Sequence, residues 1–485
     1  MRNILAVTLL ALCAGCMVGP DYRRPDLDIP KSFQYEVKEA SDTANTEWWK
    51  SFRDPVLDGL IAEALANNKS VKIAAANIEQ AAGVLTQTRA PLFPQASYAA
   101  SAGKQRASES TAVPPPAGTS NPFSTLQLFG GVNWEIDLWG RVRRLSEAAR
   151  ANLFASEEAR RGIILSLVAS VAGDYLQLRG LDEQLAIAKS NTAAYAESVK
   201  LYELQFQYGL VSQLIVEQAR TQYESAAATI PQIESQILQL ENALSILLGR
   251  NPGPIARGKA VYELAFPAVP AGLPSQLLER RPDLAQAEQN LVAANAQIGA
   301  AKALYFPTIS LTGGYGYESQ HLSDLFKGPS RIWSYAGSIT GPIFTAGAIS
   351  GQVRQTEAAQ QAALISYEAA VQSAFADVEN ALIIRTKLIE QVDAQERLVK
   401  ASQEYERLAK LQYDGGYAPY LTVLNAQQQL FPAELNLAQF RALLFVSYAN
   451  LYKAMGGGWV TEADKLTAPG DGQPAGGSQV KNRGQ

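Results

Sequence analysis

The chain of 485 residues contains one internal duplication, and this feature constrains its fold more than any other. Residues 89–94 read RAPLFP and residues 302–307 read KALYFP, which places Phe93 and Phe306 at matching points, 213 positions apart. Residues 209–214 (GLVSQL) parallel residues 416–421 (GYAPYL) at a distance of 207 positions. Matching blocks in the same order indicate two copies of one unit of about 200 residues, with small insertions between the blocks.

Each copy is predicted to hold the same elements in the same order. A helix ends at a Phe-Pro pair, where proline opposes its continuation, two strands follow, and two long helices meet at a glycine-containing turn. The predicted helices are 55–90 and 283–305, the strands 95–103, 123–138, 308–318 and 332–344, and the long helical stretches 143–248 and 348–455. We assign the copies to residues 55–259 and 260–459, and expect 460–485 to be a disordered tail because it is rich in Gly, Pro and Lys.

The predicted strands alternate between apolar and polar residues. In the second strand Leu126, Leu128 and Trp134 fall on one face, and Gln127 and Asn133 fall on the other. This pattern fits a soluble sandwich as well as a membrane barrel with lipid outside and water inside. No apolar run after the first 15 residues is long enough for a membrane-spanning helix, which favours the barrel. Four strands are too few for closure, since even small barrels need about 8, so the barrel would be shared between protomers.

The N-terminus has the pattern of a lipoprotein signal peptide, residues 1–15. A short apolar run follows Arg2, and the small residues Ala14 and Gly15 precede Cys16 directly. Cys13 is a poorer candidate because bulky Leu12 precedes it. We therefore expect Cys16 to be acylated and to begin a lipid-anchored extended segment, residues 16–54. The alternative is an ordinary secretory signal followed by an incidental cysteine.

Composition excludes several classes of function. The 42 basic and 46 acidic residues give a net charge of −4, so no basic footprint for nucleic acid is present. One histidine, His321, and two cysteines exclude a His- or Cys-rich metal site, and no cofactor motif is found. A lipid-anchored hydrolase would need a catalytic pair such as Asp174 and Asp377. These lie in mid-helix, and we take them as equivalent positions 203 residues apart, which favours a solvated or inter-helix polar role over enzymatic activity.

Four segments carry a family resemblance that covers nearly the whole chain. They are residues 16–25 (CMVGPDYRRP), 48–57 (WWKSFRDPVL), 280–284 (RRPDL) and 452–459 (YKAMGGGW). The sequence resembles outer-membrane efflux lipoproteins of the TolC type. The resemblance implies a mainly α fold with membrane β structure. It implies a homotrimer whose twelve strands, four per chain, form one outer-membrane barrel continued by a long periplasmic α-helical barrel.

The resemblance also implies a passive exit duct, lipid-anchored in the bacterial outer membrane, with no catalytic centre. Its partners would be outer-membrane lipid, a periplasmic adaptor (membrane fusion) protein and an inner-membrane pump, often a proton-driven drug exporter that supplies the energy. The alternative is an elongated periplasmic lipoprotein scaffold without a pore, and conductance in a bilayer would separate the two.

Two places in the long helices are expected to act in this duct. The turns at Gly209 and Ser212 and at Gly416 and Ala418 are the expected adaptor contacts, since both lie far from the strands and hold a glycine that permits a left-handed turn. They would form the periplasmic tips. Ordinary helix-hairpin turns without a partner are the alternative.

Just beyond the second turn, the resemblance places the periplasmic constriction, a leucine ring followed by a polar ring. Related proteins often carry aspartate at the position of Asn425 and arginine at that of Gln428, and this sequence has neither charge. We therefore expect a constriction that comprises Leu421, Asn425, Gln428 and Leu214. Leu421 would seal it by close packing and dewetting, supported by neutral hydrogen bonds of Asn425. Leu421 as a buried seam residue, like its repeat mate Leu214, is the alternative.

Overall fold

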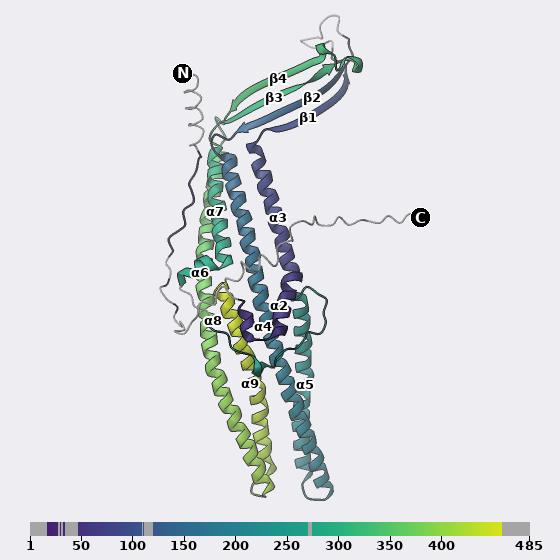
Figure 1. Ribbon diagram of the computed structural model, residues 1–485, viewed down its shortest axis with the longest axis vertical. Helices are drawn as coiled ribbons and strands as arrows, with labels where there is room; N and C mark the ends of the chain where they lie inside the picture. The colour runs from purple at the N-terminus through teal and green to yellow at the C-terminus, as the bar shows by residue number, and fades with distance from the viewer. Residues whose placement is uncertain are drawn as a thin grey trace, which may run out of the picture. The chain divides into compact units, whose positions relative to one another are not determined.

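The computed structural model of this chain describes residues 17–27, 30, 33, 47–108, 110, 120–269 and 274–457. The signal segment, Cys16 and the tail after residue 457 lie outside the described residues. The helices are α2 (Pro55–Asn67), α3 (Lys69–Arg89), α4 (Arg141–Gln207), α5 (Gln213–Leu247), α6 (Pro274–Arg280), α7 (Pro282–Ala303), α8 (Ala348–Asp414) and α9 (Tyr420–Ala454). The strands are β1 (Gln95–Gln105), β2 (Phe123–Ile136), β3 (Thr308–Ser319) and β4 (Arg331–Thr340) (Figure 1). Across these ranges no α-helix has both the length and the apolar character needed to cross a bilayer.

The chain divides into two compact units. The sheet unit comprises the described parts of residues 17–27, 77–157 and 286–368, and therefore all four strands. The helix unit comprises the described parts of residues 28–76, 158–285 and 369–457.

The four strands form one antiparallel sheet in the order β1-β2-β3-β4 (Figure 1). One row across the sheet aligns Tyr98, Gly130, Tyr315 and Trp333. Tyr98 and Trp333 in this row are exposed large side chains, as the predicted alternation requires. β4 ends at Thr340 and not at residue 344 as expected, because Gly341 and Pro342 follow and proline has no N–H for the ladder.

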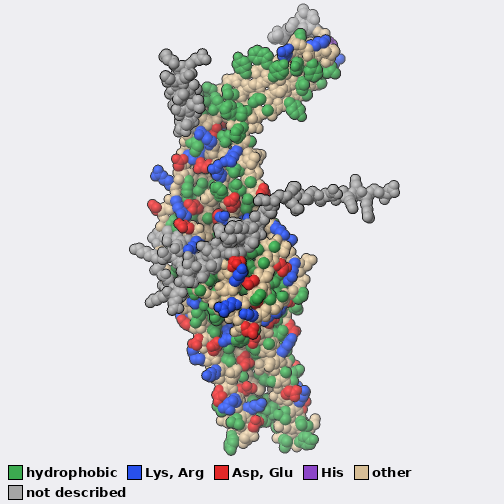
Figure 2. All heavy atoms as spheres, viewed as in Figure 1, with side chains coloured by type: hydrophobic (Ala, Val, Ile, Leu, Met, Phe, Trp, Pro, Cys, Tyr) green, Lys and Arg blue, Asp and Glu red, His purple; other side chains and the backbone are tan. Residues whose placement is uncertain are grey.

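The opposite face of the sheet is mainly polar, with Phe129 and Ile332 as exceptions, and the charged residues of the strands lie near strand ends. On the polar face the Oγ atoms of Ser310 and Ser338 lie 2.7 Å apart. The strands contain four charged residues, Lys104, Glu135, Glu318 and Arg331. Figure 2 shows hydrophobic side chains along the visible face of the sheet. The central rows thus carry no charge, which suits a sheet that crosses hydrocarbon.

The long helices confirm the duplication closely. α4 and α8 have 67 residues each, and α5 and α9 have 35 each. Both ends of each pair are 207 positions apart, so the helices leave no place for an insertion. The expected equivalence of Asp174 with Asp377, at 203 positions, was therefore wrong by about one helical turn. At 207 positions Asp174 matches Ala381, and Asp377 matches Ser170.

The first predicted helix, 55–90, is broken at Asn68. The Asn68 side chain accepts hydrogen bonds from the backbone N–H groups of Ser70 (2.9 Å) and Val71 (3.2 Å), as an N-cap does. Its Nδ2 donates to the carbonyl of Leu247, the last residue of α5, at 2.8 Å. The break thus satisfies groups at two helix ends that would otherwise lack partners.

The segment that precedes α2 packs on the core of the helix unit. Trp48 stacks on Tyr452 of α9, with ring centroids 5.0 Å apart. The buried carboxylate of Asp54 accepts hydrogen bonds from Tyr175 Oη (2.7 Å) and from the backbone N–H of Lys259 (3.1 Å). One carboxylate therefore joins this segment to α4 and to the extended chain that follows α5.

The second helices of the two copies differ in one respect. α5 contains Pro231 and α9 contains Pro432, and these prolines are not at equivalent positions. Each removes one helical hydrogen bond, the one to the carbonyl four residues earlier. In α9 that carbonyl belongs to Gln428.

Candidate functional site

The two hairpin turns have the same backbone structure. Gly209 and Gly416 are left-handed, with φ of +72° and +75°. The N–H of Gly209 donates to Phe206 O and the next N–H donates to Gln205 O, both at 2.9 Å. Gly416 repeats the pattern with Tyr413 O and Gln412 O, at 2.9 and 2.8 Å. These two hydrogen bonds are the pair that defines a Schellman motif. Both turns lie at the same end of the helix unit (Figure 1).

Both turns expose large apolar side chains, at equivalent positions in the two copies. The pairs, each 207 positions apart, are Leu201 and Leu408, Leu204 and Leu411, Leu210 and Tyr417, and Leu214 and Leu421. Leu210 and Tyr417 are the most exposed, at 73% and 88%. Of the expected contact residues, Ser212 is exposed and Ala418 is half-buried. Figure 2 shows hydrophobic side chains at this end of the helices, where an apolar surface without a partner is costly.

Leu421, Asn425 and Gln428 form one exposed stripe at the start of α9. Leu421 is 49% exposed and its repeat mate Leu214 is 66% exposed, so neither is buried within this chain. Leu424, which lies four residues before Gln428, is buried at 7% exposure and belongs to the packed side of the helix. The expected constriction residues therefore share a face that is free to meet another molecule.

A tyrosine cluster that the sequence analysis missed holds the two hairpins together near the turns. Tyr202 of α4 lies 4.5 Å from Tyr420 and 6.2 Å from Tyr413, between ring centroids. Burial raises the pKa of Tyr420 to about 12. Burial and the neighbouring tyrosines also raise the pKa of Tyr202, so both phenols stay protonated. At the positions equivalent to Tyr413 and Tyr420, the first copy has Phe206 and Gln213, both exposed.

The residues that follow Cys16 are held along the sheet unit. Val18 N donates to Trp139 O at 3.1 Å. Arg144, only 2% exposed, donates to Val18 O and Gly19 O at 3.3 Å and to Asp21 Oδ1 at 2.7 Å. Gly19 has φ of +102°, and a Cβ there would lie 2.3 Å from the Cα of Gly299. These contacts hold residues 18 and 19 in place against α4 and α7. Cys16 itself is outside the described residues.

In each copy, the end of the second long helix (α5 or α9) is joined to the start of the helix that precedes the strands (α3 or α7). In the first copy Asn68 donates to Leu247 O, as described above. In the second copy Arg281, which matches Asn68 at 213 positions, donates to Ala454 O at 3.2 Å. Arg281 also bonds Asp283 (2.7 Å) and Asp377 (2.9 Å). The second position lies in the RRPDL segment, and the contact gives that segment a structural role.

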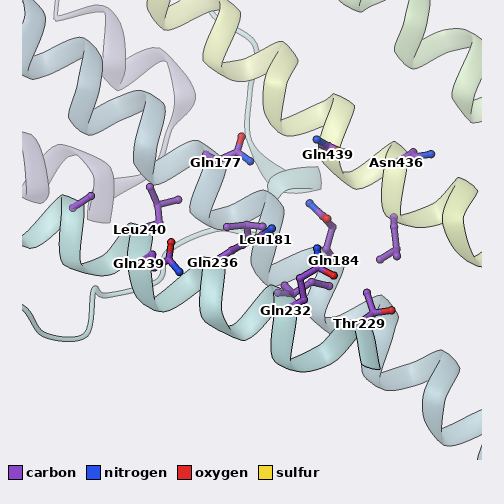
Figure 3. Close-up of a pocket in the computed structure, with 13 residues that line it drawn as sticks. Gln177, Leu181, Gln184, Thr229, Gln232, Gln236, Gln239, Leu240, Asn436 and Gln439 are labelled. Atoms are coloured by element: carbon purple, nitrogen blue, oxygen red, sulfur yellow. The ribbon is translucent and has the colours of Figure 1, made fainter. Parts of the chain in front are cut away.

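A groove of about 640 Å³, defined here as the amide groove, lies between α4, α5 and α9 of the helix unit (Figure 3). α4 contributes Gln177 and Gln184. α5 contributes three glutamines and α9 two further amides, namely Gln232, Gln236, Gln239, Asn436 and Gln439. The other lining residues are Thr229 and five apolar ones, so no side chain that lines the groove is charged.

The remaining sequence candidates have ordinary surroundings. His321 is exposed in the turn between β3 and β4. Burial raises the pKa of Asp174, and Asp377 binds Arg281. Within the ranges that the structure describes, no three His, Cys, Asp or Glu side chains gather as metal ligands would.

Sequence reasoning missed the tyrosine cluster, the Arg144 contact and the amide groove. The groove had a signal, since Gln232, Gln236 and Gln239 recur at spacings of four and three on α5. The other two join residues more than 100 positions apart, and no local spacing indicates such contacts.

Comparison with known proteins is consistent with both the duplication and the fold. A model of the family "outer membrane efflux protein" matches residues 60–250 and 273–457, one stretch in each copy. The toluene efflux pump outer membrane protein TtgC of Pseudomonas putida is 37% identical, over 94% of this chain and 95% of its own length. The probable outer membrane lipoprotein SilC of Salmonella typhimurium is 34% identical, over 94% of this chain and 99% of its own.

Among solved structures, the open state of the Neisseria gonorrhoeae MtrE outer membrane channel is similar over 92% of this chain and 99% of that chain. The TM-score is 0.82 and the sequences are 34% identical.

Proposed function

The chain belongs to the outer membrane efflux protein family, and from this membership we propose that it is the exit duct of a tripartite efflux pump. It is an outer-membrane efflux protein with the fold of a channel built from a β-barrel and an α-helical barrel. In our proposal three copies form one duct, in which twelve strands close the membrane barrel. The sheet supports this, because β1 and β4 each have one unpaired edge that a neighbouring copy would cover.

The uncharged central rows of the sheet are the observation that carries this proposal. A scaffold without a pore would not need such rows. The test is to add purified protein to a planar bilayer, with detergent alone as the control. Stepwise conductance from a species with the mass of a trimer is the expected result, and a trimer that inserts without conducting would support the scaffold.

We infer that the chain catalyses no reaction and conducts passively, with the energy supplied by an inner-membrane pump. We propose a proton-driven transporter as this pump and a periplasmic adaptor as the protein that joins it to the duct. Turns made of a left-handed glycine and exposed leucines support the adaptor contact, since a periplasmic protein that covers them would bury both apolar sets.

The adaptor contact is tested by photocrosslinking in cells. Crosslinkers at Ser212 and Ala418 are expected to capture the adaptor, and one at Thr119, between β1 and β2 in sequence, is the control. Thr119 lies outside the described residues. Capture only from Thr119 would mean that the strand loops and not Gly209 and Gly416 mark the adaptor end.

We propose that Cys16 is the acylated mature N-terminus. The bonds of Arg144 to the backbone of residues 18 and 19 support a fixed point of departure for the lipid. Intact-mass analysis of the mature protein is expected to show a lipid-sized increment on Cys16, and an unmodified N-terminus elsewhere would refute it. Because the barrel also holds the protein in the membrane, Cys16→Ser is expected to impair sorting more than folding.

We propose that the resting duct is narrowed at Leu421, with Asn425 and Gln428 in the rings beyond it. Three exposed leucines that meet on the axis of a trimer would seal by packing and dewetting. Leu214 is the matched residue in the first copy, and its exposure allows it to line the same constriction.

A further inference from the structure

The contacts of α5 show which side of this helix the amide groove occupies. Glu241 accepts a hydrogen bond from Ile255 N at 3.1 Å, and Ser245 Oγ accepts one from Gly253 N at 3.3 Å. One side of α5 is therefore covered by the extended chain that follows it. At 100° per residue, Gln232 and Gln236 lie roughly 160 to 200° around the helix from the middle of that covered side.

α4 has the same arrangement. Its covered side carries Tyr175, bound to Asp54, and Arg179, whose Nε donates to Lys259 O at 2.8 Å. Gln177 and Gln184 lie roughly 160 to 180° around the helix from the middle of this side.

α9 completes the pattern. Phe445 stacks on Phe266 with ring centroids 4.3 Å apart, and Tyr452 stacks on Trp48. Asn436 and Gln439 lie roughly 130 to 170° around the helix from the middle of the side that carries these aromatic residues. On all three helices the amides therefore point away from the segments that cover the helix unit.

In a closed ring of helices, one side of the layer faces the lumen and the other faces outward. The covering segments include α2, and a helix is about 10 Å across. Three copies of α2 and its flanking chain on the inner side would obstruct a duct, so the covered side is the outer one. The amide groove then faces the lumen.

Amide groups can meet solutes of either charge. Each glutamine offers two donors and one acceptor and carries no charge at any physiological pH. Leu181 and Leu240 lie between the amides and offer apolar contact. Resting on the proposed duct, we propose that this groove is a lumen-facing contact site for hydrogen-bonding solutes, one that applies no selection by charge.

The position of the groove is tested with a single cysteine. Gln236→Cys channels in a planar bilayer are treated with a charged methanethiosulfonate, and a lasting fall in conductance is expected. Glu234→Cys is the matched control, because Glu234 lies on the outward side of α5 in an exposed ion pair that contributes little stability. The wild-type protein, whose only cysteines are Cys13 and Cys16, shows the background.

The absence of charge selection is tested by adding charge. Under a salt gradient, Gln236→Glu is expected to shift the reversal potential toward cation selectivity, and Gln236→Lys toward anion selectivity. Reversal potentials equal to wild type in channels of normal conductance would overturn the proposal. So would a thiol in the Gln236→Cys variant that reacts without any change in conductance.

A thiol in the Gln236→Cys variant that does not react at all would also overturn it, because the groove would then be covered by a second copy of the chain. These outcomes all require that the protein conducts. A wild-type protein without conductance would instead contradict the proposed duct, so the two failures are distinguishable.

Discussion

The two copies join their helices at equivalent points with different chemistry. In the first copy Asn68 is a neutral cap that bonds two N–H groups of α3 and the last carbonyl of α5. In the second copy the side chain of Arg281 has no acceptor atom and cannot cap α7. It donates five hydrogen bonds instead, to Asp283, Asp377 and the carbonyls of Ala374 and Ala454.

In both junctions the side chain donates a hydrogen bond to the end of the second long helix, α5 or α9. The junctions differ in the other groups that the side chain bonds. Asn68 joins two helix ends, whereas Arg281 also ties α8 into the junction through Asp377 and Ala374. A glycine completes each junction, Gly249 with φ of +75° and Gly456 with φ of +82°. Duplication thus preserved the geometry, while the side chains that maintain it diverged.

The largest expected difference between the junctions comes from their glycines. A Cβ on Gly249 would lie 2.3 Å from Asn67 O, whereas one on Gly456 would lie 3.0 Å from Arg280 C. Both substitutions suffer left-handed strain, so Gly249→Ala is expected to lower the free energy of unfolding by about 3 kcal/mol and Gly456→Ala by about 1–2 kcal/mol. Urea unfolding of the detergent-solubilised protein measures both. Equal losses would show that the first junction can relax.

The tyrosine cluster provides the next contrast. Tyr420 is 4% exposed, whereas its equivalent Gln213 is exposed. Tyr420→Ala is expected to cost about 3 kcal/mol through the cavity that it leaves, and Gln213→Ala less than about 0.5 kcal/mol. Hydrogen exchange is expected to rise over residues 408–425 in the first variant only. Unchanged hydrogen exchange in the Tyr420→Ala variant would contradict the interpretation that the tyrosine cluster holds the two hairpins together.

Replacing the two junction side chains should give a smaller difference. Arg281→Ala is expected to cost about 2 kcal/mol, because two buried carbonyls lose a charged donor while the partly exposed Asp283 and Asp377 regain water. Asn68→Ala is expected to cost about 1 kcal/mol, the usual loss of an N-cap. Urea unfolding again gives the values. Arg281→Lys should recover only part of the loss, since an ammonium cannot form the bidentate bond to Asp283.

The smallest expected change in stability accompanies the sharpest test of function. Leu421→Ala and Leu214→Ala remove equivalent exposed side chains and should each cost less than about 1 kcal/mol. Leu421→Ala is expected to raise single-channel conductance and to admit large antibiotics such as vancomycin, whereas Leu214→Ala should have a smaller effect on both. Unchanged conductance in a normally assembled Leu421→Ala trimer would refute the constriction and favour a seam between helices.

Local sequence patterns predicted most of the fold. Period-two alternation placed the four strands within a few residues of their bounds, except the end of β4, where Pro342 interrupts the ladder. The glycines at 209 and 416 predicted both hairpin turns because few other residues accept a left-handed conformation. The break at Asn68 was missed, although an asparagine between two helical stretches is a common N-cap signal.

The candidate sites were less predictable than the elements. Arg144 and Asp54 act through carbonyls and hydroxyls that arrive from distant segments, and their sequence neighbourhoods resemble any solvated helix or loop. The repeat comparison also misaligned Asp174 and Asp377. Two identical residue types matched by chance, and only the bounds of α4 and α8 exposed the error.

Pro432 divides α9 into two segments that can bend relative to each other. The missing hydrogen bond to Gln428 O leaves one compliant point between the stiff segment 420–431 and the rest of the helix. That segment is about 18 Å long. A bend of about 10° at the proline would therefore carry its far end through roughly 3 Å. Three such segments would widen a ring of leucines by an amount comparable to one side chain, and the same movement would have to shift Tyr420 against Tyr202 and Tyr413.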